Sequence, residues 1–482
     1  MRVHDGFFIG GDWSAPAGRE TVDVISPSTE EPIGRIPRAT NEDIDAAVMA
    51  ARRACDEGAW PRTSPSERAE AMRTLSDALK ARHDDFAAVF TDEVGSPSLF
   101  SQLGQTLAAL MILDYYVELA DDFAFQEVRD GVMGRSLVVR EPVGVAGCIL
   151  PWNAPLYVTM LKLAPALLSG STVVLKPPPN TPLFSYLLAQ AIQDTGLPPG
   201  VVNIVPADRQ EGEHLVTHPL VDKISFTGST RAGRRVAALC GEQIKRASLE
   251  LGGKSAAIIL DDADLEQAIP ALLPAAIMNN GEACVAQTRI LASQDRHDEV
   301  VDRLTEAVSA WKVGDPHDDD TMVGPLVSAG QRERVEGYIA TGRDQGAKLA
   351  LGGGRPAHLD RGWYVEPTVF VDVDNKMTIA QEEIFGPVLS VIPYGDEAEA
   401  IAIANDSAYG LSGSVYAADP DRAVEVARQV RTGTLTVNGF TLNMCAPFGG
   451  FKQSGLGREL GPEALDAYLE PKSINVPADY QP

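Results

Sequence analysis

Between residues 145 and 226, short apolar segments alternate repeatedly with helical segments, and this alternation determines the fold class. The apolar segments read VAGCIL, TVVLK, VVNIV and KISF, and helical stretches begin between them near Leu156, Pro182 and Glu211. Segments that are apolar at nearly every position are typical of strands buried on both faces of a sheet. The alternation therefore predicts βαβ units and a parallel sheet that binds ligands at the carboxyl ends of its strands.

Outside residues 145–226, the sequence predicts helices, a hairpin and a second α/β unit. An Asn cap at Asn41 opens a helix with one apolar face, and two long helical patterns follow. Because the chain has 482 residues, we expect two or three domains. The predicted elements are helices over 41–56, 65–95 and 98–119, exposed strands within 120–142, and strands alternating with helices from 255 to about 450.

Composition and charge narrow the class of protein. The formal net charge of −26 repels phosphate backbones and anionic lipids, so we expect neither nucleic-acid nor membrane partners. The N-terminus lacks the apolar core of a signal peptide, and the longest apolar run, 268–278, is short and twice broken by proline. Five scattered cysteines favour a reducing, cytoplasmic setting, and no His or Cys spacing suggests a metal site.

Two polar residues follow the first two of these strands. Asn153 lies in PWNAP, where flanking prolines fix the backbone, so its amide either donates into a cleft or belongs to a plain turn. Lys176 begins KPPPNTP at the end of a buried strand, where a cation is costly unless it meets an anion or hydroxyls. The alternative for Lys176 is a polyproline bend that only ends the strand.

Two further segments follow later strands. In FTGSTRAG, 226–233, Ser229 or Thr230 caps a helix whose free N–H groups suit a phosphate, although the middle glycine of the usual dinucleotide motif is missing. In ELGGK, 250–254, Glu250 between two leucines is either a general base of raised pKa or a surface residue before a turn.

Cys284, in NNGEACVAQTR, is the residue on which the function depends. Taken alone it is either a small core residue, as free cysteines often are, or a nucleophile.

The motifs together resemble the NAD(P)-dependent aldehyde dehydrogenase superfamily. The resemblance covers nearly the whole chain, and the family's motifs occur in the family's order. The spacing of 34 positions from Glu250 to Cys284 also agrees with the family. The matching segments are PWNAP, KPPPNTPL, FTGST, ELGGK, GEACVA, EEIFGPV, NDSAYGLSGSV and PFGGFKQSGLGRELG.

The resemblance implies catalytic roles. Cys284 is expected to attack the aldehyde and form a thiohemiacetal and then a thioester, with Asn153 and the Cys284 backbone N–H holding the oxyanion. Glu250 is expected to activate the water that hydrolyses the thioester. Glu459 resembles a second carboxylate that relays protons, and Lys254 a support for the site around Glu250.

The resemblance also implies cofactor contacts. Lys176 is expected to hold the adenosine ribose, Glu383 the nicotinamide ribose, and Phe385 to pack against it. The helix start at Gly228, Ser229 and Gly233 is expected to face the pyrophosphate. Trp152, Pro179 and Leu251 complete the predicted contacts.

Departures from the family's pattern affect specificity. Pro179 stands where a glutamate often excludes a 2′-phosphate, so NAD is expected while NADP stays possible. Glu282 replaces a common glutamine two positions before the nucleophile. Smaller or flexible side chains at four positions predict a wide apolar entrance for medium to large hydrophobic or aromatic aldehydes; these are Ala154, Val158, Leu161 and Met278.

The expected architecture is an α/β fold with a Rossmann-like cofactor domain, an α/β catalytic domain and a small β oligomerisation element. The cofactor domain comprises 1–120 and 142–250, the catalytic domain 251–453, and the oligomerisation element 121–141 and 454–482. Arg246 or Arg458 is expected to pair with Glu470, and the protein to form a homodimer or homotetramer. The alternative functions are a CoA-acylating dehydrogenase and a catalytically silent binding protein of the same fold.

Overall fold

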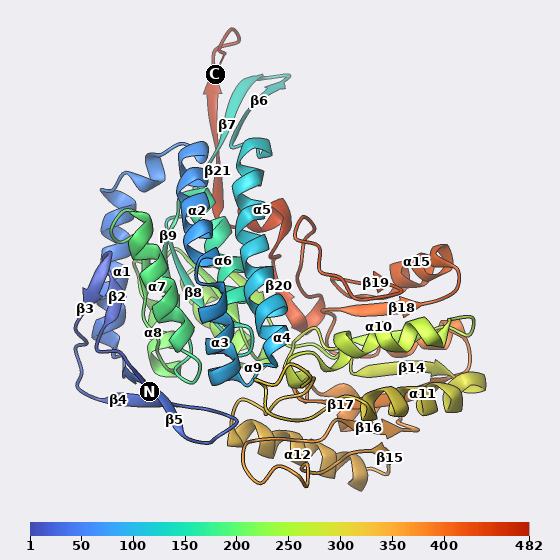
Figure 1. The fold of residues 1–482 in the computed structure, drawn as a ribbon. Coiled ribbons are helices and arrows are strands. Elements are labelled where there is room, and N and C mark those ends of the chain that lie inside the picture. Colours follow the sequence, from blue (N-terminus) through green and yellow to red (C-terminus); the bar gives the residue numbers. More distant parts are fainter. Residues whose placement is uncertain (482) are drawn as a thin grey trace.

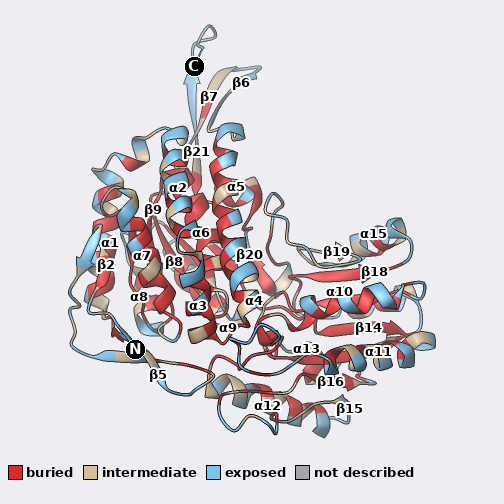
Figure 2. Ribbon diagram, viewed as in Figure 1, coloured by how far each residue is buried: buried red, intermediate tan, exposed pale blue. Residues whose placement is uncertain are grey.

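The computed structural model describes residues 1–481 and contains four sheets, two large and two small. In Figure 1 the N-terminal half forms a helix-covered sheet, the later half a second layered unit beside it, and three strands project as an arm. Figure 2 shows that the central strands of the two large sheets are buried, while strands at their edges and the outer sides of the helices are exposed. The α/β class expected from the sequence is confirmed.

The first large sheet has eight strands in the order β20-β12-β11-β8-β9-β10-β2-β3. Its five central strands are parallel, and antiparallel strands close both edges. This confirms the predicted βαβ units. The strands are β2 (Phe7–Ile9), β3 (Asp12–Ser14), β8 (Val145–Ile149), β9 (Thr172–Lys176), β10 (Val202–Ile204), β11 (Lys223–Thr227), β12 (Arg246–Glu250) and β20 (Gly455–Leu456).

Helices cover both faces of this sheet and pack into two apolar cores. One core joins the sheet to α2 (Pro65–Lys80), α3 (His83–Val94), α5 (Ala108–Asp122), α6 (Pro155–Ser169) and α7 (Leu183–Thr195). The other core joins it to α1 (Asn41–Asp56), α8 (Arg209–Thr217) and α9 (Thr230–Glu242).

Three details of the helical region differ from the sequence predictions. The cap of α1 is Thr40 rather than Asn41, because the Thr40 N–H donates to Asp43 Oδ2 at 2.8 Å. The pattern over 65–95 is two helices, since Arg82 leaves the helical conformation and pairs with Asp194 of α7. The pattern over 98–119 contains α4 (Ser98–Phe100) and a π-helical turn, η2 (Ser101–Leu107), before α5.

The second large sheet has seven strands in the order β15-β16-β17-β14-β13-β18-β19 and confirms the series predicted from 255 to about 450. Its strands are β13 (Ala256–Ile259), β14 (Arg289–Ser293), β15 (Lys348–Leu351), β16 (Thr368–Val371), β17 (Val388–Tyr394), β18 (Gly413–Tyr416) and β19 (Thr436–Val437). The helices are α10 (Leu265–Ile277), α11 (His297–Ser309), α12 (Ala329–Asp344), α13 (Thr378–Gln381), α14 (Glu397–Asn405) and α15 (Pro420–Gln429).

The projecting arm in Figure 1 is an antiparallel sheet in the order β21-β7-β6. It joins β6 (Gln126–Gly131) and β7 (Gly134–Pro142) to β21 (Leu469–Val476) near the C-terminus. Arg246 makes the expected ion pair with Glu470 at the base of this arm.

The remaining elements are short. They are β1 (Arg2–Val3), β4 (Thr21–Ile25), β5 (Pro32–Pro37), α16 (Gly461–Asp466) and the 3-10 turns at Trp60–Arg62, Asn279–Gly281, Gln294–Arg296 and Lys452–Ser454. Within residues 1–481, no helix is long and apolar enough to cross a bilayer.

Candidate active site

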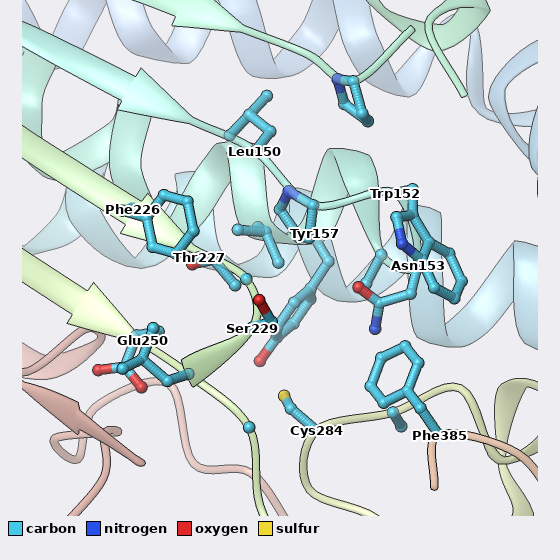
Figure 3. Close-up of a pocket in the computed structure, with 18 of the residues that line it drawn as sticks. Leu150, Trp152, Asn153, Tyr157, Phe226, Thr227, Ser229, Glu250, Cys284 and Phe385 are labelled. Atoms are coloured by element: carbon cyan, nitrogen blue, oxygen red, sulfur yellow. The ribbon is translucent and has the colours of Figure 1, made fainter. Parts of the chain in front are cut away.

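A cavity of about 1390 Å³ opens at the carboxyl ends of β8, β9, β11 and β12. Residues of the second large sheet's unit close its other side, including Cys284 and Glu383. Figure 3 shows Cys284 between Asn153 and Glu250, which come from different strand ends. The position agrees with the rule that open parallel sheets bind ligands at their carboxyl edge.

The loop before Cys284 holds the nucleophile in a strained backbone. Asn279, Asn280 and Gly281 have successive φ angles of 51°, 62° and 76°, a left-handed run that glycine adopts readily and asparagine more readily than most other residues. The Asn280 amide stabilises the run by donating to the Gly95 and Pro325 carbonyls at 3.0 and 2.9 Å.

Asn153 is buried and fixed from two sides. Its backbone carbonyl accepts hydrogen bonds from Gln105 Nε2 at 2.7 Å and from Asn279 Nδ2 at 2.9 Å. Its side-chain Nδ2 donates to the Glu282 carbonyl at 2.8 Å. One N–H of the amide is thereby held on the nucleophile loop, and the second N–H is free to act at the cavity.

Cys284 is partly exposed, and its side chain extends toward Tyr157 in Figure 3. Burial and the nearby carboxylates of Glu383 and Glu250 raise the pKa of the Cys284 thiol to about 12. Most molecules therefore carry a neutral thiol at neutral pH, and attack requires loss of its proton.

Glu250 ends β12 and is buried, and neither carboxyl oxygen has a hydrogen-bond partner. Burial raises the pKa of Glu250 well above 4.5, and Glu459 raises it further, while Lys162 and Arg458 act in the opposite direction. A carboxylate whose pKa is raised binds a proton more strongly than an ordinary glutamate, which suits a general base.

Glu459 lies on the wall of the cavity, whereas Lys254 does not reach it. Glu459 lines it and pairs with the fully buried Lys162 at 2.5 Å. Lys254 lies behind the wall, where its backbone carbonyl accepts from Arg289 Nε at 3.0 Å and its Nζ has no partner. Burial and, to a lesser extent, Arg289 lower the pKa of Lys254 to about 7.

The adenosine end of the cavity contains Lys176, Pro179 and the start of α9. Lys176 Nζ donates to the Ala207 carbonyl at 2.5 Å, and burial lowers the pKa of Lys176 to about 8. Ser229 caps α9 by accepting from the Ala232 N–H at 3.3 Å, and the helix begins at the cavity wall.

Gly233 allows α9 to approach the sheet closely. A Cβ at Gly233 would lie 2.4 Å from Leu251 Cδ2, so this glycine serves helix packing. Gly228 lies on the cavity wall just ahead of the helix start.

The opposite end of the cofactor region contains Glu383, Trp152 and Phe385. Glu383 Oε1 accepts from the Gly253 N–H at 3.1 Å, and burial raises the pKa of Glu383 to about 7. Phe385 has a left-handed φ of 64° and meets Trp152 edge to face with ring centroids 5.2 Å apart. A positive φ is strained for phenylalanine, so the residues packed around Phe385 must hold its backbone in this conformation.

The predicted substrate residues Ala154, Val158, Leu161 and Met278 all line the cavity. They share this wall with apolar residues from α4, η2 and the loop after β19 that the sequence did not predict. These are Phe100, Leu103, Phe440, Leu442, Met444 and Phe448.

The sequence did not predict several other residues of the site. Tyr157 carries a buried hydroxyl without a partner beside Cys284, and Lys162 is the one basic residue in the apolar helix α6. A polar residue in so apolar a helix was the available signal for Lys162. Arg209 and Arg235 line the adenosine end and both pair with Glu213, a placement that no local pattern indicates.

Comparisons with known sequences and structures all point to one protein family. The sequence model of the aldehyde dehydrogenase family matches residues 13–474. The chain is 48% identical to the geranial dehydrogenase of Castellaniella defragrans, over 98% of both chains. It is 46% identical to a 3-succinoylsemialdehyde-pyridine dehydrogenase of Pseudomonas sp, over 98% of this chain and 99% of the relative.

A solved structure gives the same result. The Mycobacterium tuberculosis aldehyde dehydrogenase complexed with NAD+ is 47% identical, with a TM-score of 0.98 over 100% of this chain and 99% of that one. The chain belongs to the aldehyde dehydrogenase family.

Proposed function

We propose that this enzyme oxidises hydrophobic aldehydes to carboxylic acids with NAD, through a covalent adduct on Cys284. The observation that carries the proposal is the convergence of Cys284, Asn153 and Glu250 on one cavity that also contains the start of α9. Nucleophile, amide donor and base are the groups that acyl transfer through a thioester requires.

The residues at the cofactor end fit a dinucleotide. The N-terminus of α9 offers N–H groups and positive potential to a pyrophosphate, and buried Lys176 offers a cation at the adenosine end. Glu383 has one oxygen on Gly253 and the other available for a ribose hydroxyl. Bound NAD would supply the nicotinamide that accepts a hydride from the aldehyde carbon.

The chain's own residues carry the other steps. The Cys284 thiol first loses its proton to water. The thiolate sulfur then bonds to the aldehyde carbon as the carbonyl π bond opens, and Asn153 Nδ2 and the Cys284 N–H stabilise the oxygen that becomes negative. Loss of one such donor typically costs on the order of a hundredfold in rate. After oxidation leaves a thioester, Glu250 takes a proton from water, whose oxygen bonds to the acyl carbon. The carbon–sulfur bond then breaks, the acid is released and the Cys284 sulfur is free again.

The apolar wall of the cavity supports the substrate class. Phe440, Leu442 and Met444 join Val158 and Leu161 to surround the approach to Cys284 with hydrocarbon. Burial of apolar substrate area there contributes roughly 25 cal/mol per Å². The name of the geranial dehydrogenase relative agrees with an aldehyde of this chemistry.

We propose that the enzyme also accepts NADP, as a secondary cofactor. Pro179 presents no carboxylate to a 2′-phosphate, and Arg209 and Arg235 lie on the same part of the wall. NAD stays the expected main cofactor because both arginines are already paired with Glu213.

We also propose that the chain has the three parts expected from the sequence, and that it assembles into a homodimer or homotetramer through the β21-β7-β6 arm. All five cysteines are free thiols, which supports the cytoplasmic location expected from the sequence.

Formation of NADH and NADPH with an aldehyde panel, from acetaldehyde to benzaldehyde and citral, tests the function in the absence of CoA. We expect turnover that favours the bulky aldehydes and disappears in Cys284→Ala. Turnover that requires added CoA would instead support an acylating dehydrogenase. Binding of NAD without any turnover would support a silent member of the fold.

A further inference from the structure

A single tyrosine hydroxyl interrupts the apolar wall that α6 presents to the cavity. Tyr157 lies in the first turn of this helix, whose residues are almost all apolar. Ala154 and Leu161, three positions before it and four after it, share its face of the helix and also line the cavity. Tyr157 is therefore the one member of this stripe that brings a polar group to the cavity.

The hydroxyl of Tyr157 is buried and has no hydrogen-bond partner among the residues that the structure describes. Elsewhere in the chain, the buried Tyr116 hydroxyl donates to the Gly461 carbonyl at 3.0 Å. The Tyr394 hydroxyl likewise donates to the Ile259 carbonyl at 2.8 Å. Because a buried polar group without a partner costs free energy, a hydroxyl that faces a cavity is suited to bond a polar atom inside it.

The Tyr157 hydroxyl lies near the reacting sulfur but makes no hydrogen bond to it. The charges of Cys284 and Glu459 both act on the hydroxyl, and Glu459 also acts on Glu250. In Figure 3 the hydroxyl lies on the Glu250 side of Cys284, whereas Asn153 lies on the other side. An acyl group on Cys284 would thus have the oxyanion donor on one side and this hydroxyl on the other.

Tyr157 keeps its proton near neutral pH. Burial raises the pKa of Tyr157 above 10, and the charges of Cys284 and Glu459 raise it further. The residue is therefore no second base beside Glu250. It offers a neutral hydroxyl, whose oxygen accepts a hydrogen bond and whose proton can donate another.

We propose that Tyr157 is a further catalytic residue of the hydrolytic step, and that its hydroxyl oxygen binds the water that Glu250 activates. The inference rests on the proposed function of Cys284 and Glu250. It adds a second hydrogen bond that fixes the direction from which the water attacks.

A water molecule held at two points has its attacking lone pair oriented. One O–H of the water donates to the Glu250 carboxylate and the other to Tyr157 Oη, so that a lone pair faces the acyl carbon. Glu250 takes the first proton as the oxygen–carbon bond forms. The carbon–sulfur bond then breaks with its electron pair on the Cys284 sulfur, which takes the proton back from Glu250. The second proton leaves with the acid, and Tyr157 keeps its own proton throughout.

The test isolates hydrolysis from oxidation by loading Cys284 with an acetyl group from p-nitrophenyl acetate. Decay of the acyl-enzyme is followed by intact mass. Tyr157→Phe keeps the ring and removes only the oxygen. We expect it to slow the decay on the order of tenfold, because one of the two hydrogen bonds that orient the water is lost.

Hydroxylamine separates the orientation of water from a general disturbance of the site. It is a stronger nucleophile than water and attacks a thioester without help from a base. We expect it to remove the acetyl group from Tyr157→Phe and from the unaltered enzyme at rates within about twofold of each other. Alkylation of Cys284 by iodoacetamide should also stay within about twofold, because the hydroxyl is not bonded to the sulfur.

Tyr186→Phe is the matched control. Tyr186 of α7 also has a buried hydroxyl without a partner among the described residues. It lies outside the set of residues that line the cavity, and its ring stacks on His4 with centroids 3.8 Å apart. We expect its acyl-enzyme to decay within about twofold of the unaltered rate.

Two results would overturn the proposal. One is acyl-enzyme decay at the unaltered rate in folded Tyr157→Phe. The other is slow decay in which cleavage by hydroxylamine is slowed to the same extent, since this marks a change in packing around Cys284. Failure of the unaltered protein to acquire an acyl group on Cys284 would instead refute the proposed function itself.

Discussion

At the scale of single residues, the thiol of Cys284 is held in its neutral form. The pKa of Cys284 is raised to about 12. At any pH below this value, the thiolate fraction therefore increases about tenfold when the pH is raised by one unit. We expect the rate of alkylation by iodoacetamide, without cofactor, to rise continuously from pH 6 to pH 9 (roughly a thousandfold). The exposed Cys445 provides the internal comparison. A plateau for Cys284 near pH 7 would contradict the raised pKa.

We expect Pro179 to determine how strictly the enzyme selects NAD over NADP. Pro179→Glu places a carboxylate at the adenosine end, where it repels a 2′-phosphate. We expect kcat/KM for NADP to fall at least about tenfold relative to NAD, a difference of about 1.4 kcal/mol. Pro179→Ala controls for loss of the ring and should leave the ratio near its original value. An unchanged ratio in Pro179→Glu would show that the 2′-position lies elsewhere.

At the scale of structural elements, the left-handed turn before Cys284 depends on Asn280. Its side chain makes two donor bonds and accepts from the Gly324 N–H at 2.6 Å, all in a buried setting. Asn280→Ala removes these bonds and strains a φ of 62°, so we expect a loss of about 2–4 kcal/mol in the free energy of unfolding. Denaturant unfolding measures it, with exposed Asn443→Ala as the control. A loss below about 0.5 kcal/mol would contradict a structural role for this turn.

The sequence predicts local and motif-bearing elements well and long-range ones poorly. The strands that lead to Asn153 and Lys176 follow from apolar runs, because burial on both faces leaves a direct signal. The strand that ends at Glu250 reads RASLE and was not predicted, because it contains no apolar run. The break at Arg82 does not follow, since no glycine or proline marks it and its ion pair with Asp194 is distant in sequence. The cavity wall from Phe440 to Phe448 is likewise an irregular loop without periodicity.

At the scale of the whole molecule, the β21-β7-β6 arm is the surface proposed for assembly. Both outer strands present unpaired backbone, and the tip residues Val132 and Met133 are fully exposed hydrophobic side chains. We expect light scattering to give the mass of a dimer or tetramer, and the double change Val132→Asp with Met133→Asp to lower it. Exposed Ile244→Asp, on the main body, is the control. An unaltered protein that is monomeric at micromolar concentration would contradict assembly through the arm.

The most direct test of the proposed chemistry is to trap the covalent intermediate. Glu250→Gln is mixed with NAD and citral, quenched, and the peptide that contains Cys284 is weighed. Because hydrolysis depends on Glu250 and oxidation does not, we expect about one NADH per active site and an acyl group on that peptide. NADH formation that continues at the unaltered rate, or an acyl group on no cysteine, would contradict it.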